Sequence, residues 1–215
     1  MKNSLLVTTA LEETWEKNNN VLFLGEWCKR PNRERYWTKL NSQTIPYHWN
    51  NRDKLQKDYL FSKKVYNELI IKLSQNLNSF HNTNYSNRYW KIILGPWLSS
   101  FIQLVLERYE NLKQLKNENF NLETIVLDLN HDLLLPSNIE SYYRSLMTDT
   151  WNHFIFSEIL KTSDLFQSIK KKKGEFKDTE NFDSYFRYKY NSKSRNIYSH
   201  LSSLFKKKIL KEKYL

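Results

Sequence analysis

Residues 5–28, LLVTTALEETWEKNNNVLFLGEWC, contain two short apolar runs separated by a polar connection. The runs at 5–9 and 21–25 have the length and composition of buried strands, and turn-forming or polar residues close each of them. A third run of this kind, LETIVL at 122–127, leads directly into Asp128. Because strands separated by long helical segments pair in parallel, these runs predict an α/β domain with a small parallel sheet and long helices.

Long amphipathic segments lie between the second and third predicted strands. Over residues 52–80 the apolar side chains recur at spacings of three and four, which predicts one helix. A second helical segment follows, and Ser86 is placed to cap it. The pair Gly95-Pro96 interrupts this segment, and since proline is poorly accepted inside a helix, we expect two pieces, at 86–94 and 96–115.

The remaining stretches are less regular. Residues 29–53 have no sustained period and are interpreted as loop, whereas a helix is predicted from Pro136 through Leu160. The segment KKKKGEFKDTENF at 170–182 is interpreted as a charged linker. We therefore divide the chain into an α/β domain at 1–160 and a basic linker or tail at 161–215, where a second domain would start.

The positive charge of the chain is concentrated in this tail. Of the net charge of +11, residues 1–160 contribute +2, from 19 Lys and Arg against 17 Asp and Glu, and residues 161–215 contribute +9, from 15 against 6. A basic tail predicts weak, nonspecific binding to anionic surfaces. It leaves open a noncatalytic alternative, in which the chain is a nucleic-acid- or membrane-surface-binding protein.

Several chemistries are disfavoured by the residue types present. With 3 glycines, the chain has no G-x-G-x-x-G or P-loop motif for cradling a phosphate. The single Cys28 permits no disulfide within the chain and suits a reducing compartment, so we expect a cytoplasmic protein. The histidines show no H-x-x-x-H spacing, and we expect neither a metal site nor a tightly bound cofactor.

Polar side chains follow two of the predicted strands. Glu26 and Trp27 come after VLFLG, and Asn130 and His131 come after the third strand. Because parallel strands deliver their following residues to one edge, we expect these four residues to share that edge, where α/β sheets bind ligands. Glu26 equally suits a structural ion pair or a helix cap. His131 with Asp132 forms a possible base and orienting carboxylate, although adjacent side chains usually point apart.

Aromatic-rich blocks carry the other candidates. His48 lies in PYHW, where it can either pack or hydrogen-bond, and Arg88 and Trp97 bound the block RYWKIILGPW. Tryptophan rings stack on sugar faces, but they are also ordinary core residues. The sequence leaves both readings open.

Taken in order, the blocks LLVTTALEETW, VLFLGEWC, IPYHWNNRDKL and RYWKIILGPWLSSFIQLVLERY resemble a transferase family found in gene clusters for O-antigen and other surface polysaccharides. The resemblance runs from Ser4 to Asn152. It implies a glycosyltransferase of GT-B-like architecture, built from two Rossmann-like halves and using a nucleotide-sugar donor as substrate. Members of that family are longer, so the resemblance implies that this chain supplies mainly the N-terminal half and does not turn over sugar nucleotides alone.

In such an enzyme the second half holds the donor, and the first half receives a sugar or lipid-linked saccharide acceptor, here at the inner face of the membrane. If a partner half completes the enzyme, we expect Glu26 or His131 to be the base that deprotonates an acceptor hydroxyl, and Arg88 to hold an anionic acceptor group. Glu13, Trp27, His48, Trp97 and Asn130 complete the expected substrate-binding set. An inactive gene fragment is the third possibility. The matching family positions are Glu13, Trp15, Gly25, Glu26, Trp27, His48, Trp49, Asp53, Arg88, Trp90, Gly95, Pro96 and Trp97.

Overall fold

The strands of the described chain lie side by side in the order β3-β2-β1-β4-β5, and every neighbouring pair is parallel. The computed structural model describes residues 3–16, 20–117, 121–129 and 134–176. This strand order is that of a doubly wound Rossmann-type sheet, which confirms the predicted α/β fold. The strand bounds are β1 Asn3–Val7, β2 Asn20–Phe23, β3 Ser42–Thr44, β4 Asn121–Asp128 and β5 Lys170–Glu175.

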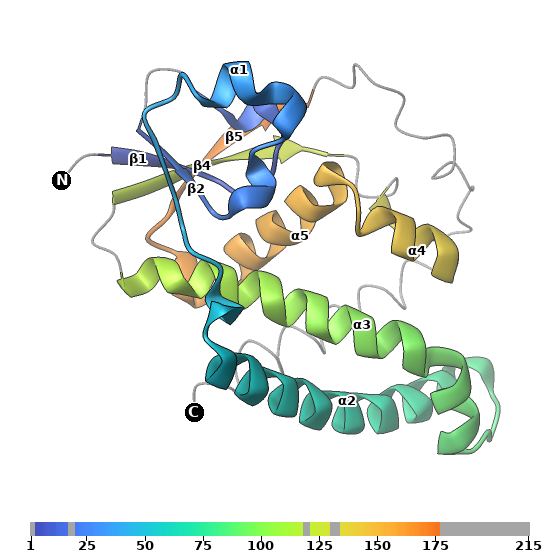
Figure 1. Cartoon of the computed structure of the whole chain (residues 1–215). Coiled ribbons are helices and arrows are strands. Elements are labelled where there is room, and N and C mark those ends of the chain that lie inside the picture. The colour runs from blue at the N-terminus through green and yellow to red at the C-terminus, as the bar shows by residue number, and fades with distance from the viewer. Residues whose placement is uncertain (1–2, 17–19, 118–120, 130–133, 177–215) are drawn as a thin grey trace.

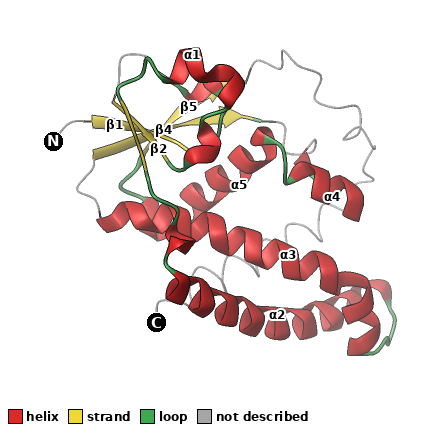
Figure 2. Cartoon of the chain, viewed as in Figure 1, coloured by secondary structure: helices red, strands yellow, loops and turns green. Residues whose placement is uncertain are grey.

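Helices cover both faces of the sheet. Figure 1 shows α3 and α5 on one side and α1 on the other, and Figure 2 shows the same view coloured by secondary structure. The central strands are therefore buried on both faces, which explains why Leu5, Leu6 and Val7 are consecutive apolar residues with no solvent exposure. The helices are α1 Glu34–Trp37, α2 Arg52–His81, α3 Asn87–Lys113, α4 Ile139–Ser145 and α5 Asp149–Thr162. Short 3-10 turns are η1 Glu12–Thr14, η2 Glu26–Cys28, η3 Pro31–Arg33, η4 His48–Asn50, η5 Gln114–Asn117 and η7 Asp164–Phe166.

Helices α2 and α3 form an antiparallel hairpin that extends beyond the sheet (Figure 1). As predicted, Ser86 caps α3, since its side chain accepts a hydrogen bond from Tyr89 N at 3.2 Å. Asn82 ends α2 in the left-handed conformation, with φ of 53°. The two helices share a small apolar core of their own, made of Val65, Leu69, Ile70, Leu73, Leu98 and Ile102.

The predicted break at Gly95-Pro96 is wrong, because α3 runs through both residues without interruption. Pro96 lies on an exposed face, where water can bind the carbonyl that proline leaves without a helical donor. Gly95 faces α2, and a Cβ at this position would lie 2.8 Å from Tyr66 Oη. Close packing of the two helices therefore keeps α3 continuous.

Two other expectations are corrected. The helix predicted from Pro136 to Leu160 is two helices, because α4 ends near Ser145 and Thr148 caps a new start for α5. The linker interpretation is wrong for Lys170–Glu175, which forms β5 and pairs with residues 123–128 of β4. Lysines suit such an edge strand, since their charge discourages pairing with another chain. Residues 177–215, most of the predicted tail, lie outside the described residues.

Candidate functional site

Strand order changes direction between β1 and β4, and in open α/β sheets ligands bind at the carboxyl ends of the strands at this point. The pairing of β1 with β4 extends as far as Leu6 opposite Thr124. The pairing of β4 with β5 continues to Asp128. The last residues of β4 are thus unpaired on the β1 side, and we call this part of the carboxyl edge, where side chains replace strand pairing, the opening between β1 and β4.

A histidine from α5 occupies this opening. Leu127 N donates a hydrogen bond to His153 Nε2 at 3.1 Å, so a neutral His153 carries its proton on Nδ1. Burial, with a smaller contribution from the Lys161 cation, lowers the pKa of His153 to about 4. Among the described residues, no hydrogen-bond partner faces Nδ1. His153 is therefore a neutral hydrogen-bond acceptor for the free edge of β4, and it carries no charge near pH 7.

Asp149, one turn earlier on α5, likewise accepts a backbone hydrogen bond, here from the segment that follows β1. Asp149 Oδ1 accepts a hydrogen bond from Ala10 N at 3.2 Å, and Oδ2 forms an ion pair with Arg30. The Asp149 side chain is largely buried, whereas that of Arg30 is 52 % exposed. The guanidinium of Arg30 is therefore held in place on one side and open to solvent on the other. Such a group can bind a phosphate or carboxylate.

The loop after β1 contributes further polar atoms. Thr8 and Thr9 are buried, and Thr9 Oγ1 has no hydrogen-bond partner in the part of the chain that the structure describes. A second ion pair joins Glu12 Oε2 to Arg33 Nη2 at 2.5 Å. The residues after β1 and β2 are thus joined to each other and to α5 by charged contacts.

Trp27 lies at this edge, as its position after β2 predicts. Its Nε1 donates to Thr8 O at 2.9 Å, and its ring makes an edge contact with Tyr47 at 6.3 Å between centroids. The side chain is 38 % exposed, so one part of the ring is open to a ligand. Gly25 permits this placement, because a Cβ there would lie 2.0 Å from Trp27 Cζ3.

Glu26 begins η2 at the same edge, but its side chain is 77 % exposed and pairs with Lys29 at 2.8 Å. Cys28 is buried against Val7 O, and burial raises the pKa of its thiol to about 12, so the thiol is not a nucleophile near pH 7. Asn130 and His131 lie outside the described residues. The structure therefore joins Trp27 to the opening and leaves Glu26 on its outer surface.

The other sequence candidates occupy different places. Glu13 is exposed in η1, and His48 is buried in η4 between the rings of Tyr47 and Trp49, at 5.1 and 4.9 Å between centroids. Trp97 stacks on Phe101 at 5.4 Å in the packing of α3 against α4. Arg88 is exposed in the first turn of α3, on the hairpin.

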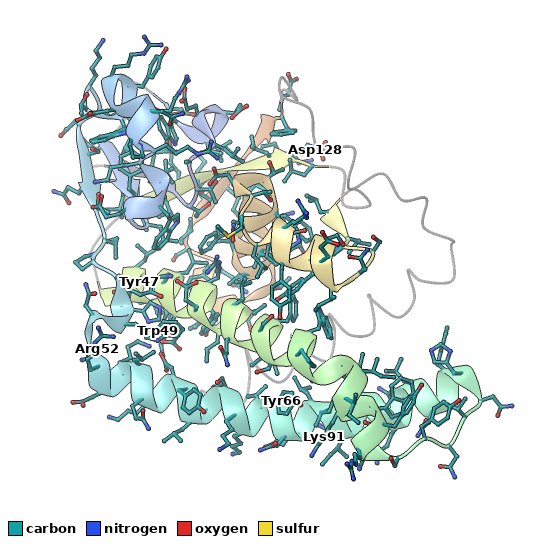
Figure 3. All side chains as sticks on the ribbon, turned by 45° about the vertical axis from the view of Figure 1, so that its right-hand side comes forward. Tyr47, Trp49, Arg52, Tyr66, Lys91 and Asp128 are labelled. Atoms are coloured by element: carbon teal, nitrogen blue, oxygen red, sulfur yellow. The ribbon has the colours of Figure 1, made fainter. Side chains whose placement is uncertain are left out.

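A buried charged network at the base of the hairpin has no counterpart in the sequence analysis. Lys54 Nζ contacts Asp58 at 2.6 Å and Glu110 at 2.5 Å. Burial lowers the pKa of Lys54, but hydrogen bonds to these carboxylates outweigh it and raise the pKa overall. Trp49 Nε1 donates a hydrogen bond to Asp58 of this network at 3.0 Å, and Figure 3 shows Tyr47 and Arg52 at the same end of the hairpin. The network fixes α2 against α3 and is a structural feature.

No cluster of three His, Cys, Asp or Glu side chains suited to a metal ion occurs within the described ranges. The opening between β1 and β4 instead has the held guanidinium of Arg30 and the partly exposed indole of Trp27 beside it. These groups can bind an anionic or saccharide ligand.

Comparison with protein families identifies the chain. A family model described as LIC12162 family transferase matches residues 4–215, and the chain therefore belongs to this transferase family. A search of curated proteins and a search of solved structures each returned no match.

Proposed function

We propose that this transferase is a glycosyltransferase, which moves a sugar from a nucleotide-sugar donor to a sugar or lipid-linked saccharide acceptor during synthesis of O-antigen or another surface polysaccharide. The observation that carries the proposal is the polar opening between β1 and β4 of a Rossmann-type sheet, in a chain that belongs to a transferase family. Rossmann-like halves are the building units of the GT-B-like architecture that the sequence blocks resemble. The proposal gives this chain the N-terminal, acceptor-side half.

In this function Arg30 holds an anionic group of a substrate. Asp149 orients Arg30 and compensates part of its charge, and the free side of the guanidinium offers two parallel donors to a phosphate or carboxylate. Trp27 provides a flat apolar surface for a sugar ring. Because Trp27 is anchored to Thr8 O, its ring is positioned before the ligand arrives.

Transfer to a hydroxyl group also needs a base. Glu26 remains our proposal for this role, since its carboxylate is exposed at the same edge and its contact with Lys29 is a surface ion pair that a substrate can displace. His131 remains the second candidate. His153 is assigned no proton transfer, because its Nε2 is occupied by Leu127 N.

The test separates acceptor binding from turnover. Binding of saccharide acceptors and of UDP-, GDP- and CMP-sugars is measured by hydrogen–deuterium exchange at residues 7–12 and 24–30, and transfer is measured as nucleotide release. Arg30→Gln is expected to weaken acceptor binding about tenfold, the loss of one charged hydrogen-bonded contact. Arg35→Gln, on the exposed side of α1, is the matched control and should leave binding unchanged.

Two outcomes count against the proposal. Absence of binding by any saccharide or sugar nucleotide would refute it. If Arg30→Gln and Arg35→Gln change acceptor binding equally, the binding site does not lie at the opening between β1 and β4. Glu26→Gln is tested in an enzyme completed by the donor-binding half, with circular dichroism as a check on folding. If Glu26 is the base, the variant loses transfer and keeps binding; if Glu26 only forms a surface ion pair, the variant keeps both.

A further inference from the structure

The end of the α2–α3 hairpin exposes large apolar side chains. We define the hairpin tip as residues 71–93, which comprise the end of α2, the connection and the first two turns of α3. Ile92 is 69 % exposed and Ile93 is 51 % exposed. The other exposed members are Ile71, Phe80, Tyr85 and Tyr89. An apolar concentration of this kind on one projecting element is typical of an interaction surface.

The exposed groups are held in a fixed arrangement. Tyr89, Ile92 and Ile93 follow the i, i+3, i+4 spacing and share one face of α3. The ring of Tyr85 stacks on that of Tyr89 at 4.2 Å, which extends this face into the connection.

The connection between α2 and α3 is held in place by the side chain of Asn78. Asn78 Oδ1 accepts hydrogen bonds from Tyr85 N at 3.0 Å and Trp90 Nε1 at 2.9 Å. The apolar surface is therefore built by the fold and is not the result of a frayed helix end.

The charge of the tip has one sign. Between Glu68 and Glu107 the sequence contains no Asp or Glu, and its charged residues are Lys72, Arg88 and Lys91. All three are exposed. Figure 3 shows Lys91 on the α3 arm of the tip, remote from Tyr47 and Arg52 at the base of the hairpin. This segment therefore combines aliphatic, tyrosine and basic side chains without any acidic group.

The apolar character continues along α3. In the described chain, residues Asn87–Lys116 form a helical stretch long and apolar enough to cross a bilayer by length and composition. Only 28 % of its most apolar window is buried. A core helix would have most of such a stretch covered. Here α3 packs on α2 and on α5, and Tyr89, Ile92 and Ile93 in its first two turns remain exposed.

From these observations we propose that the hairpin tip docks on an anionic lipid bilayer, with Ile92, Ile93 and Phe80 at the boundary between headgroups and acyl chains. Tyrosine side chains suit this boundary, because the ring is apolar and the hydroxyl stays hydrated. Arg88 and Lys91 then lie at the level of the lipid phosphates. The absence of acidic groups favours an anionic membrane over a second copy of this basic chain. In Figure 1 the tip projects past the sheet in the direction of the β4 arrowhead, which orients the carboxyl edge of the sheet toward the same surface.

The test uses the full 215-residue chain and sedimentation with vesicles of phosphatidylcholine, with or without phosphatidylglycerol. The double variant Ile92→Ser/Ile93→Ser is expected to lower the partition coefficient on anionic vesicles by an order of magnitude or more. The matched apolar control is Met147→Ser, since Met147 is 86 % exposed in the connection between α4 and α5. Lys91→Glu should weaken binding at least about fivefold on anionic vesicles, while the exposed control Lys39→Glu has little effect.

Salt distinguishes this surface from the basic tail. Binding through the tail alone is electrostatic and would be lost at high salt, whereas insertion of the isoleucines leaves a salt-resistant component. Wild-type binding that the double variant retains in full would overturn the proposal. So would a concentration-dependent dimer in sedimentation velocity that the double variant loses, without vesicle binding by either protein. The experiment measures vesicle binding and not sugar transfer. A negative result would therefore refute the membrane proposal without bearing on the proposed glycosyltransferase activity.

Discussion

Replacing His153 by glutamine tests whether a neutral imidazole holds the free edge of β4. A glutamine carbonyl can accept the hydrogen bond from Leu127 N that Nε2 accepts at 3.1 Å, but it does not titrate. His153→Leu instead removes the acceptor and leaves a buried N–H without a partner, which costs about 1–3 kcal/mol at every pH. The two variants therefore separate the hydrogen bond from the protonation.

The magnitude follows from the pKa. Burial lowers the pKa of His153 from 6.5 to about 4, so the unfolded chain binds a proton more readily than the folded one between these values. Protons then favour unfolding. Stability is fully present above pH 6.5 and is lost as the pH falls toward 4. Linkage gives a loss of about 2 kcal/mol between pH 7.5 and pH 5.0, and about 3 kcal/mol by pH 4.

The assay is urea unfolding at pH 7.5 and pH 5.0, followed by far-ultraviolet circular dichroism. Carboxylates and other histidines also contribute to acid destabilisation, but they do so equally in both proteins, and the difference isolates His153. The wild-type chain should lose about 2 kcal/mol more than His153→Gln over this interval. His81→Gln is the control, because His81 is exposed at the end of α2. Equal losses in wild type and His153→Gln would refute the assignment of a buried neutral imidazole.

Three further changes probe how the fold is held. Lys54→Met removes the cation between Asp58 and Glu110 and should destabilise the chain by about 3–5 kcal/mol in urea unfolding, whereas Lys57→Met, an exposed neighbour, should stay within about 0.5 kcal/mol. Gly25→Ala should lower the free energy of unfolding by about 1–3 kcal/mol, because the added Cβ would lie 2.0 Å from the Trp27 ring. This loss should almost vanish in a Trp27→Ala background, and an unchanged loss there would contradict the steric explanation. Ser86→Ala removes the cap of α3 and should lower stability by about 1 kcal/mol, which thermal unfolding can detect.

The central strands could be predicted from the sequence and the edge strands could not, for a physical reason. The central strands β1, β2 and β4 are covered on both faces of the sheet, so each contains three consecutive apolar residues, at 5–7, 21–23 and 125–127. The edge strand β3, Ser42–Thr44, is polar and mostly exposed, and β5 has the sequence KKKKGE. These two segments are strands because β2 and β4 present free backbone groups to them. Their own composition contains little of that information.

The positions of candidate-site residues were predictable only where these residues follow a strand directly. The position of Trp27 follows from the end of β2, and Glu26 shares its edge. Arg30 and Asp149 are 119 residues apart in sequence, and no short motif joins them. The aromatic block from Arg88 to Trp97 has the composition of a binding site, but its contacts are structural. Trp90 donates a hydrogen bond to Asn78 within the hairpin, and Trp97 stacks on Phe101 where α3 packs against α4. A local pattern cannot distinguish these uses, since both require aromatic rings beside polar groups.

One face of α5 explains why the sheet opens where it does. Asp149 and His153 are four residues apart and therefore lie on the same side of the helix. Asp149 accepts the N–H of Ala10 beyond β1, and His153 accepts the N–H of Leu127 on β4. If β1 and β4 paired directly at this level, backbone carbonyls of the neighbouring strand would accept these N–H groups. Because side chains of α5 accept them instead, the strands can separate without leaving these donors buried and unpaired. The same face binds Arg30, so the contacts that open the sheet also hold the cation proposed to meet the substrate.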